Sequence, residues 1–356
     1  MGCGSVEMAD FRLSYISVPL EKPFVTSLRR VRSADAVRVE LVEREGFCGV
    51  GEAPPTKAVT GEGRGEIEES ITSVIAPNFL GRRFDSLASA LKALHSCSAG
   101  SSAKAAVDMA LYDLWMKKDP SQTGIFESEE VETRTCITVS LGAPEEMAQD
   151  AADAVSRGCG VLKVKLGGGD GADVERIEAV RSAAPKAKLL ADANQAWSEE
   201  EAHSIIESIY PFGVELVEQP LRAVDIDGMR RVRESSPIRI LADESVFTLE
   251  DAKKVIESGA ADMVNVKLMK CGGVSKAAEI LGWCEKNGVE CMMGSMLETP
   301  VSIGAAARVA AAFKECIRYI DLDSPLLYRE MPEDSAIRIE GDMLTLGGRR
   351  GRSRFA

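Results

Sequence analysis

Short apolar runs, each closed by one polar or charged residue, recur along the chain between residues 135 and 324 and limit what it can fold into. The spacing is roughly 25 residues, about the length of one strand and helix unit of a parallel barrel. Barrel enzymes build their sites from residues at the C-terminal ends of successive strands. The pattern therefore predicts a barrel whose mouth carries Thr138, Lys165, Asp192, Glu218, Asp243, Lys267, Ser295 and Asp321.

Eight of the apolar runs have the length and composition of strands, and amphipathic helical patterns separate them. No helix of similar strength follows the eighth run. We therefore predict an α/β fold, a (β/α)7β TIM-like barrel over residues 133–325, and a C-terminal segment, 326–356, that packs back on the first domain. The expected strands are 136–140, 161–165, 188–192, 214–218, 240–243, 263–267, 290–293 and 317–321.

Residues 1–132 lack this alternation, and strand patterns precede helical ones there. This order predicts a separate α+β capping domain, which a polar stretch without a clear period, 119–133, joins to the barrel. Two further stretches, 22–30 and 49–63, are predicted to be loops. The expected strands are 11–18 and 36–42, and the expected helices lie at about 66–76, 85–95 and 101–118.

The charge and the cysteine content narrow the class of partner. Lys and Arg total 43 against 56 Asp and Glu, a formal charge of −13, which argues against nucleic acid or an anionic membrane and favours a small molecule. No apolar run approaches the roughly 20 residues of a membrane helix. The nine cysteines are scattered and the two histidines are too few for a His-rich metal site. We expect a cytoplasmic protein with reduced thiols.

Three acids, Asp192, Glu218 and Asp243, each close an apolar run on consecutive predicted strands. Carboxylates at neighbouring strand ends repel one another unless a cation joins them, and an all-oxygen shell with open positions suits Mg²⁺. We therefore predict one Mg²⁺ per subunit on these acids. The alternative is that each acid caps the helix that follows it, but three such acids in succession argue against this.

Lysine ends the second and the sixth predicted strands, so Lys165 and Lys267 should face each other across the mouth. A lysine is a useful general base only when its pKa is lowered towards neutrality, and burial and nearby cations both have that effect. Lys163 points to the same side as Lys165 and could be such a cation, as could the metal. The alternative is two solvated lysines at the rim, although lysines behind apolar residues inside strands are unusual.

The combination resembles the enolase superfamily over nearly the whole chain. The resemblance includes Gly51-Glu52-Ala53-Pro54 and Val59-Thr60-Gly61-Glu62 in the first domain, and the helical stretch 106–114. It implies a divalent metal that holds a substrate carboxylate as an enediolate forms, and strand-borne bases that move the α-proton. Lysines on both walls resemble the muconate lactonizing enzyme subgroup, which includes cycloisomerases, o-succinylbenzoate synthases and dipeptide epimerases.

The last predicted strand distinguishes among these subgroup members. Asp321 and Asp323 lie at period two, so both carboxylates face one side and form a spot suited to an ammonium group. The pair resembles the Asp-x-Asp signature of dipeptide epimerases, which binds the substrate amine. The alternative is that the two acids form a turn before Pro325.

Two other stretches resemble L-Ala-D/L-Glu epimerases in particular. Residues 293–299, with Ser295 and Met296, match the loop that lines the path of the dipeptide in these enzymes. Arg29 matches a capping-loop arginine that pairs with the glutamate side chain, for which a bidentate guanidinium is well suited. The family's Gly-x-Pro stretch near 119–131 and its usual C-terminal ending are absent here.

The resemblance implies a Mg²⁺-dependent epimerase that inverts the α-carbon of the second residue of L-Ala-L-Glu, with a role in cell-wall peptide metabolism. Lys165 and Lys267 would move the proton, Lys163, Thr138, Ser295 and Met296 would complete the wall, and loops 24–30 and 59–63 would close over the substrate. Assembly as a homo-oligomer is compatible with the sequence. The alternatives are a cycloisomerase or o-succinylbenzoate synthase and, from another class, a non-catalytic barrel that binds a small molecule.

Overall fold

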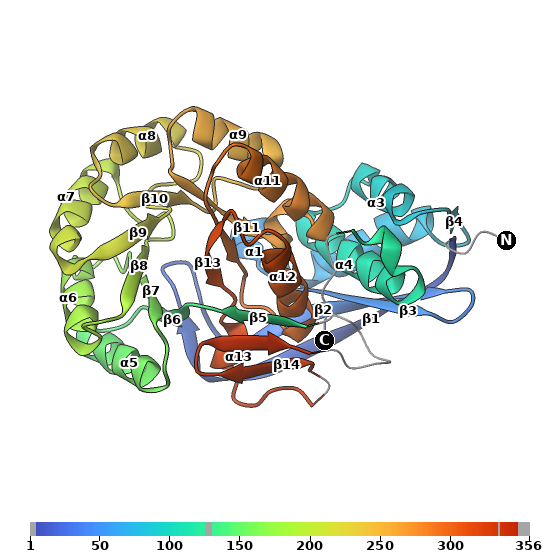
Figure 1. Ribbon diagram of the computed structural model, residues 1–356, viewed down its shortest axis with the longest axis horizontal. Coiled ribbons are helices and arrows are strands. Elements are labelled where there is room, and N and C mark those ends of the chain that lie inside the picture. Colours follow the sequence, from blue (N-terminus) through green and yellow to red (C-terminus); the bar gives the residue numbers. More distant parts are fainter. Residues whose placement is uncertain (1–4, 125–129, 334, 348–356) are drawn as a thin grey trace.

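The computed structural model describes residues 5–124, 130–333 and 335–347 of the 356-residue chain. Eight parallel strands form a barrel with helices on its outside, and an antiparallel sheet with its own helices lies beside it (Figure 1). The predicted barrel with an N-terminal α+β domain is confirmed. Parts of the predicted linker and of the C-terminal segment lie outside the described residues.

The barrel strands follow one another in chain order, and each pairs in parallel with the next. Five of the predicted strands have the observed bounds and the other three differ by one residue at each end. The strands are β6 (Ile137–Val139), β7 (Val161–Lys165), β8 (Lys188–Asp192), β9 (Val214–Glu218), β10 (Arg239–Ala242), β11 (Met263–Lys267), β12 (Cys291–Gly294) and β13 (Ile317–Asp321).

Apolar side chains fill the barrel below its mouth. Leu190 lies two residues before Asp192, and the same spacing relates Leu216 and Leu241 to the next two acids. These leucines form a buried cluster with Met263 and Met292. Because strand side chains alternate between faces, the acid at the end of each of these strands points the same way as the leucine, but at the mouth.

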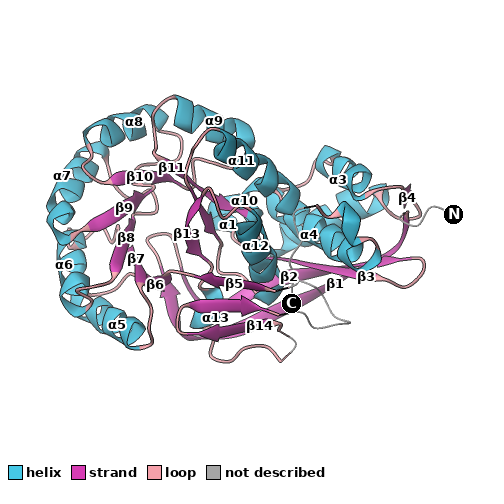
Figure 2. Ribbon diagram, in the orientation of Figure 1, coloured by secondary structure: helices cyan, strands magenta, loops and turns pink. Residues whose placement is uncertain are grey.

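Helices cover the outside of the barrel strands, as Figure 2 shows. The eighth strand is followed only by the short helix α13, as the sequence predicted. The helices of this half are α5 (Pro144–Ser156), α6 (Asp173–Ala183), α7 (Glu199–Ile209) with the 3₁₀ turn η4 (Tyr210–Phe212), α8 (Ile226–Ser235), α9 (Leu249–Glu257), α10 (Leu268–Cys271), α11 (Val274–Lys286), α12 (Pro300–Ala312) and α13 (Ser324–Leu327).

The N-terminal sheet has the strand order β3-β2-β1-β4, and its long β1/β2 hairpin runs from the N-terminal domain to the barrel (Figure 1). The predicted helices are all present. The elements are β1 (Val6–Val25), β2 (Arg30–Glu43), β3 (Cys48–Ala53), α1 (Lys57–Thr60), α2 (Arg64–Glu69), the π-helix η1 (Ser70–Ile75), the 3₁₀ turn η2 (Ala76–Asn78), β4 (Arg83–Phe84), α3 (Leu87–Ser96), α4 (Ser101–Lys118) and the 3₁₀ turn η3 (Pro120–Gln122).

The prediction of a loop from residue 49 onward is wrong, because β3 occupies 48–53. Its glycines are required by helix packing: a Cβ at Gly49 would lie 2.0 Å from the Ala110 carbonyl oxygen, and one at Gly51 would lie 1.9 Å from that of Ala106. Both carbonyls belong to α4, whose backbone approaches the strand more closely than any side chain would allow. Glycine here marks close packing and not a turn.

Two further expectations need correction. Residues 22–25 belong to β1 and β2 begins at Arg30, so only residues 26–29 form the hairpin turn. The stretch predicted as a linker ends in β5 (Val131–Arg134), which forms a three-stranded sheet with β14 (Ile337–Glu340) and β15 (Met343–Leu346). Residues 24 and 25 pair with Val31 and Arg30 across the hairpin turn. β5 instead pairs with β15, which lies about two hundred residues further along the chain, so its own sequence gives little signal for a strand.

A carboxylate of the N-terminal domain caps a barrel helix and so joins the two halves. Glu52 on β3 accepts hydrogen bonds from Thr299 Oγ1 at 2.6 Å and from Val301 N at 3.2 Å, at the start of α12. A carboxylate at a helix N-terminus satisfies free backbone donors there.

No helix in the described part of the chain is long and apolar enough to cross a bilayer.

Candidate active site

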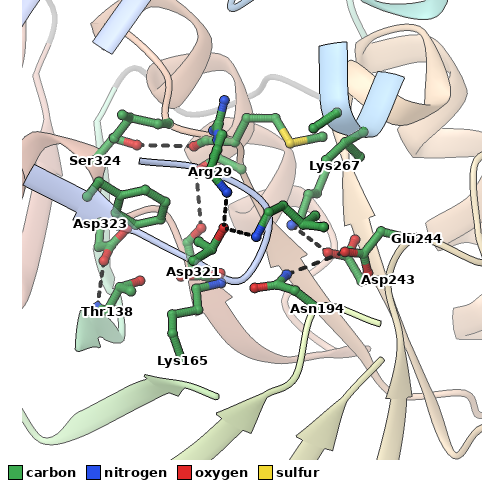
Figure 3. Close-up of a pocket in the computed structure, with 18 residues that line it drawn as sticks. Arg29, Thr138, Lys165, Asn194, Asp243, Glu244, Lys267, Asp321, Asp323 and Ser324 are labelled. Carbon is green, nitrogen blue, oxygen red and sulfur yellow. Dashed lines mark hydrogen bonds and ion pairs between the residues drawn. The ribbon is translucent and has the colours of Figure 1, made fainter. Parts of the chain in front are cut away.

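A pocket of about 610 Å³, open solvent at its rim included, lies at the mouth of the barrel (Figure 3). The N-terminal domain contributes Phe24, Thr26, Leu28, Arg29, Ala58 and Val59. The barrel contributes Thr138, Lys165, Asn194, Asp243, Glu244, Lys267, Ser295, Met296, Leu297, Asp321, Asp323 and Ser324.

Three of the predicted acids lie at the ends of adjacent strands. Asp192 ends β8, Glu218 ends β9 and their Cα atoms are register partners, while Asp243 directly follows β10. All three are buried. Only Asp243 reaches the pocket surface, so the other two lie beneath its lining.

Lysine amines lie among these acids. Lys163 Nζ is 2.7 Å from Glu218 Oε2, 3.2 Å from Asp192 Oδ2 and 2.7 Å from Asp321 Oδ2. Burial alone would lower the pKa of Lys163, but the charges of Asp321, Glu218 and Asp192 outweigh it and raise this pKa well above its usual value. Lys163 is therefore a fixed cation in the barrel.

The two lysines predicted as bases enter the pocket from different strands, β7 and β11, and Figure 3 shows them on different sides of it. Lys165 Nζ lies 2.6 Å from Asp192 Oδ2, and Lys267 Nζ lies 2.7 Å from Asp243 Oδ2. Burial favours a low pKa for Lys267, but the charge of Asp243 raises it above the usual value. In this arrangement Lys267 lacks the lowered pKa that we expected of a base, because a carboxylate is its nearest neighbour.

Among the described residues, no three Asp, Glu, His or Cys side chains converge on a point that could hold a metal ion. The amines of Lys163, Lys165 and Lys267 lie against the acids instead. Even so, the buried carboxyl groups at this end of the barrel outnumber the buried amines: they are Asp192, Glu218, Asp243, Glu244, Asp321 and Asp323, against Lys163, Lys165, Lys267 and Lys270. Burial and the charge of Asp192 raise the pKa of Glu218 to about 8.

The rim of the same cluster has unpaired oxygens. Asn194 Oδ1 and Glu244 Oε2 are buried without a hydrogen-bond partner, and burial together with the charge of Asp243 raises the pKa of Glu244 to about 7. Excess buried carboxylate and unpaired oxygen donors fit a hard divalent cation such as Mg²⁺. The residues that would hold it are Asp192, Glu218 and Asp243.

The acidic pair at the end of β13 lies on the opposite side of the pocket from Asp243 (Figure 3). Asp323 Oδ2 accepts a hydrogen bond from the Thr138 backbone N at 2.6 Å. Burial and the charge of Asp321 raise the pKa of Asp323 to about 6. Two buried carboxylates side by side form a spot where a cation would be stabilised.

Arg29 reaches the pocket from the hairpin turn of the N-terminal domain. Burial lowers the pKa of its guanidinium, with no carboxylate acting on it, and Arg29 forms no ion pair within the described ranges. A desolvated guanidinium without a partner is suited to a carboxylate of the ligand. Ser295 and Met296 also line the pocket, and Ser295 donates from both its backbone N and its Oγ to the Asp321 carbonyl oxygen.

Sequence reasoning missed several residues of this site. Lys270 Nζ donates to Asp243 Oδ1 at 2.5 Å and to Asn265 O at 2.9 Å, and Asn265 Nδ2 donates to Glu218 Oε1 at 2.9 Å. Lys270 could have been predicted as a site residue because it follows Lys267 by one helical turn, which brings the two side chains to the same region. Asn265 was detectable as a polar residue two positions before Lys267, on the same face of β11.

The chain matches two family models that together cover most of it. Residues 10–121 match the mandelate racemase / muconate lactonizing enzyme N-terminal domain, and residues 146–352 match the enolase C-terminal domain-like family. The first match covers most of the N-terminal domain, and the second covers most of the barrel.

Several curated relatives and solved structures are similar over nearly their full length. An L-amino acid-D/L-Glu epimerase of Sulfurimonas denitrificans is 43% identical over 91% of this chain and 95% of that protein. The substrate-liganded L-Ala-D/L-Glu epimerase of Bacillus subtilis superposes with a TM-score of 0.90 at 38% identity, over 96% of this chain and 97% of that one. A dipeptide epimerase of Enterococcus faecalis, complexed with Mg and L-Leu-L-Tyr, gives 0.88 at 33% identity, over 96% and 97%.

Proposed function

Because the chain belongs to the mandelate racemase and muconate lactonizing enzyme group of the enolase superfamily and is an isomerase, we propose that it epimerises dipeptides at the α-carbon of the second residue. L-Ala-L-Glu is the proposed substrate and L-Ala-D-Glu the product. One observation carries the proposal: two buried lysines on separate strands, Lys165 and Lys267, enter one pocket from different sides above a cluster of carboxylates.

The chemistry follows from this placement. With the α-carbon between the two amines, one lysine removes the proton from one face and the other delivers a proton to the opposite face, which inverts the centre. Each amine must be neutral to act as a base, so its carboxylate neighbour, Asp192 or Asp243, has to be engaged elsewhere in the working enzyme. A Mg²⁺ ion on Asp192, Glu218 and Asp243 would engage these acids and stabilise the negative charge that develops on the substrate carboxylate.

The remaining pocket residues would orient the dipeptide. Asp321 and Asp323, together called the amine subsite from here on, bind the N-terminal ammonium group. Arg29 pairs with the side-chain carboxylate of a second-residue glutamate. These contacts recognise the two ends of the dipeptide and place its second α-carbon between the lysines. A cycloisomerase or succinylbenzoate substrate has no cation to offer the buried acidic pair.

The direct test is incubation of L-Ala-L-Glu with the protein and Mg²⁺ in D₂O. The expected result is deuterium at the glutamate α-carbon, observed by mass spectrometry and NMR, with accumulation of the D-Glu epimer. A library of dipeptides in the same assay identifies the preferred second residue. Absence of exchange from every dipeptide, with binding retained, would favour the non-catalytic alternative.

A further inference from the structure

The first and last barrel strands meet at a seam beside the amine subsite. Cys136 directly precedes β6, and its backbone N donates to the Ile320 carbonyl oxygen on β13 at 2.8 Å. Its side chain lies against Asp321, and Thr138, two residues later, contacts Asp323 through its backbone N. Cys136 is 3% exposed.

Each acid of the amine subsite receives a donor from this edge of the barrel. Cys136 Sγ lies 3.2 Å from Asp321 Oδ1, and Thr138 N lies 2.6 Å from Asp323 Oδ2. The second oxygen of Asp321 accepts from Lys163 Nζ at 2.7 Å. Both oxygens of Asp321 are thus held by buried donors, which fixes the orientation of the carboxylate.

The Cys136 thiol is suited to this role because it stays protonated. Burial and the negative charges of Asp321 and Asp323 raise its pKa well above that of an ordinary cysteine. A thiol is also a weak donor, so it orients Asp321 while leaving most of the negative charge available to another cation. A buried hydrophobic residue in this place would leave the Asp321 oxygen without its donor.

We propose that Cys136 is a positioning residue of the amine subsite, whose S–H group holds Asp321 in the orientation that accepts the substrate ammonium group. The proposal rests on the proposed function, since it takes the ammonium of the dipeptide as the ligand of Asp321 and Asp323. Cys136 itself does not line the pocket and so acts through Asp321.

The kinetic test compares Cys136→Ala, Cys136→Ser and the control Cys159→Ala, whose thiol is also 3% exposed but forms no side-chain hydrogen bond with the acids. We expect Cys136→Ala to raise the KM for L-Ala-L-Glu by about 3- to 10-fold, the size of one ordinary hydrogen bond, because the thiol is a weak donor and acts on the ammonium group only through Asp321. The kcat should stay within about twofold, because the reacting α-carbon is elsewhere. Cys136→Ser, which keeps a donor, should restore most of the affinity, and Cys159→Ala should behave as wild type.

A ligand without the amine separates positioning from general damage. N-propionyl-L-Glu is the dipeptide with its ammonium group replaced by hydrogen, and its inhibition constant should be the same for wild type and Cys136→Ala. Equal weakening of both ligands, or a fall in kcat without a change in KM, would overturn the proposal in favour of a packing role.

A spectroscopic measurement does not depend on turnover. The infrared difference between wild type and Cys136→Ser isolates the S–H stretching band of this thiol, and Asp321→Asn should move that band to higher wavenumber because the acceptor loses its charge. An unmoved band would contradict the contact with Asp321. If wild type exchanges no dipeptide proton but the band moves, the proposed function fails while the positioning of Asp321 by Cys136 stands.

Discussion

In the barrel, Lys165 and Lys267 each lie within 2.7 Å of a buried carboxylate, whereas Arg29 on the N-terminal hairpin faces the same pocket without an ion-pair partner in the described part of the chain. The barrel groups stand at the ends of paired strands, and Arg29 stands in a turn of four residues. Under the proposed function, the barrel fixes the groups that move the proton, while the hairpin presents an unpaired guanidinium that recognises the substrate.

Removing a barrel lysine should have the largest effect. Lys165→Ala or Lys267→Ala each leaves one face of the α-carbon without a proton carrier, so epimerisation should fall by about 10²- to 10⁴-fold or more. Exchange in D₂O from a single enantiomer should survive in each variant, and the two variants should retain opposite enantiomers. Loss of exchange from both enantiomers in either variant would argue against one lysine per face.

Removal of the divalent cation should also stop the reaction. Chelation with EDTA is expected to abolish exchange and added Mg²⁺ to restore it, because without the cation Lys165 and Lys267 stay paired with Asp192 and Asp243 and cannot act as bases. Asp192→Asn should weaken Mg²⁺ binding measured by calorimetry, a readout that does not need turnover. Unchanged Mg²⁺ affinity in this variant would remove Asp192 from the metal site.

Changing the hairpin should alter selectivity more than rate. Arg29→Ala is expected to lower kcat/KM for L-Ala-L-Glu by about 10- to 100-fold, the size of a lost charged pair, with little change for a dipeptide whose second residue is uncharged. Arg32→Ala, on the same hairpin but outside the pocket lining, is the matched control. A uniform loss across both dipeptides would show that Arg29 supports closure and not recognition.

The smallest effect is a pH dependence of binding. Burial and the charge of Asp321 raise the pKa of Asp323 to about 6, and only the ionised form attracts an ammonium group. As pH falls below about 6, Asp323 takes up a proton and KM should rise by about tenfold per unit at saturating Mg²⁺. Asp323→Asn should bind less tightly at neutral pH and lose this dependence. A KM that is flat down to pH 5 in wild type would exclude Asp323 as an ionised ligand.

The barrel was predictable because its signal is local. A strand buried on both faces requires an apolar run, and a site residue must follow that run, so β7 and β11 with Lys165 and Lys267 were located to the residue. The N-terminal domain was harder. Gly49 and Gly51 predicted a loop, yet they lie in β3 because α4 packs directly against the strand, and this contact joins segments about sixty residues apart.

The chain by itself determined which chemical groups reach the mouth, because period-two alternation behind apolar runs is set by the order of residues. Only the tertiary structure decided how these groups pair. Lys163 bridges Glu218 and Asp321, and Cys136 meets Asp321 across the seam where the first and last strands join. Such pairings depend on which strand ends become neighbours when the barrel closes, and the charge on each group depends on that neighbourhood.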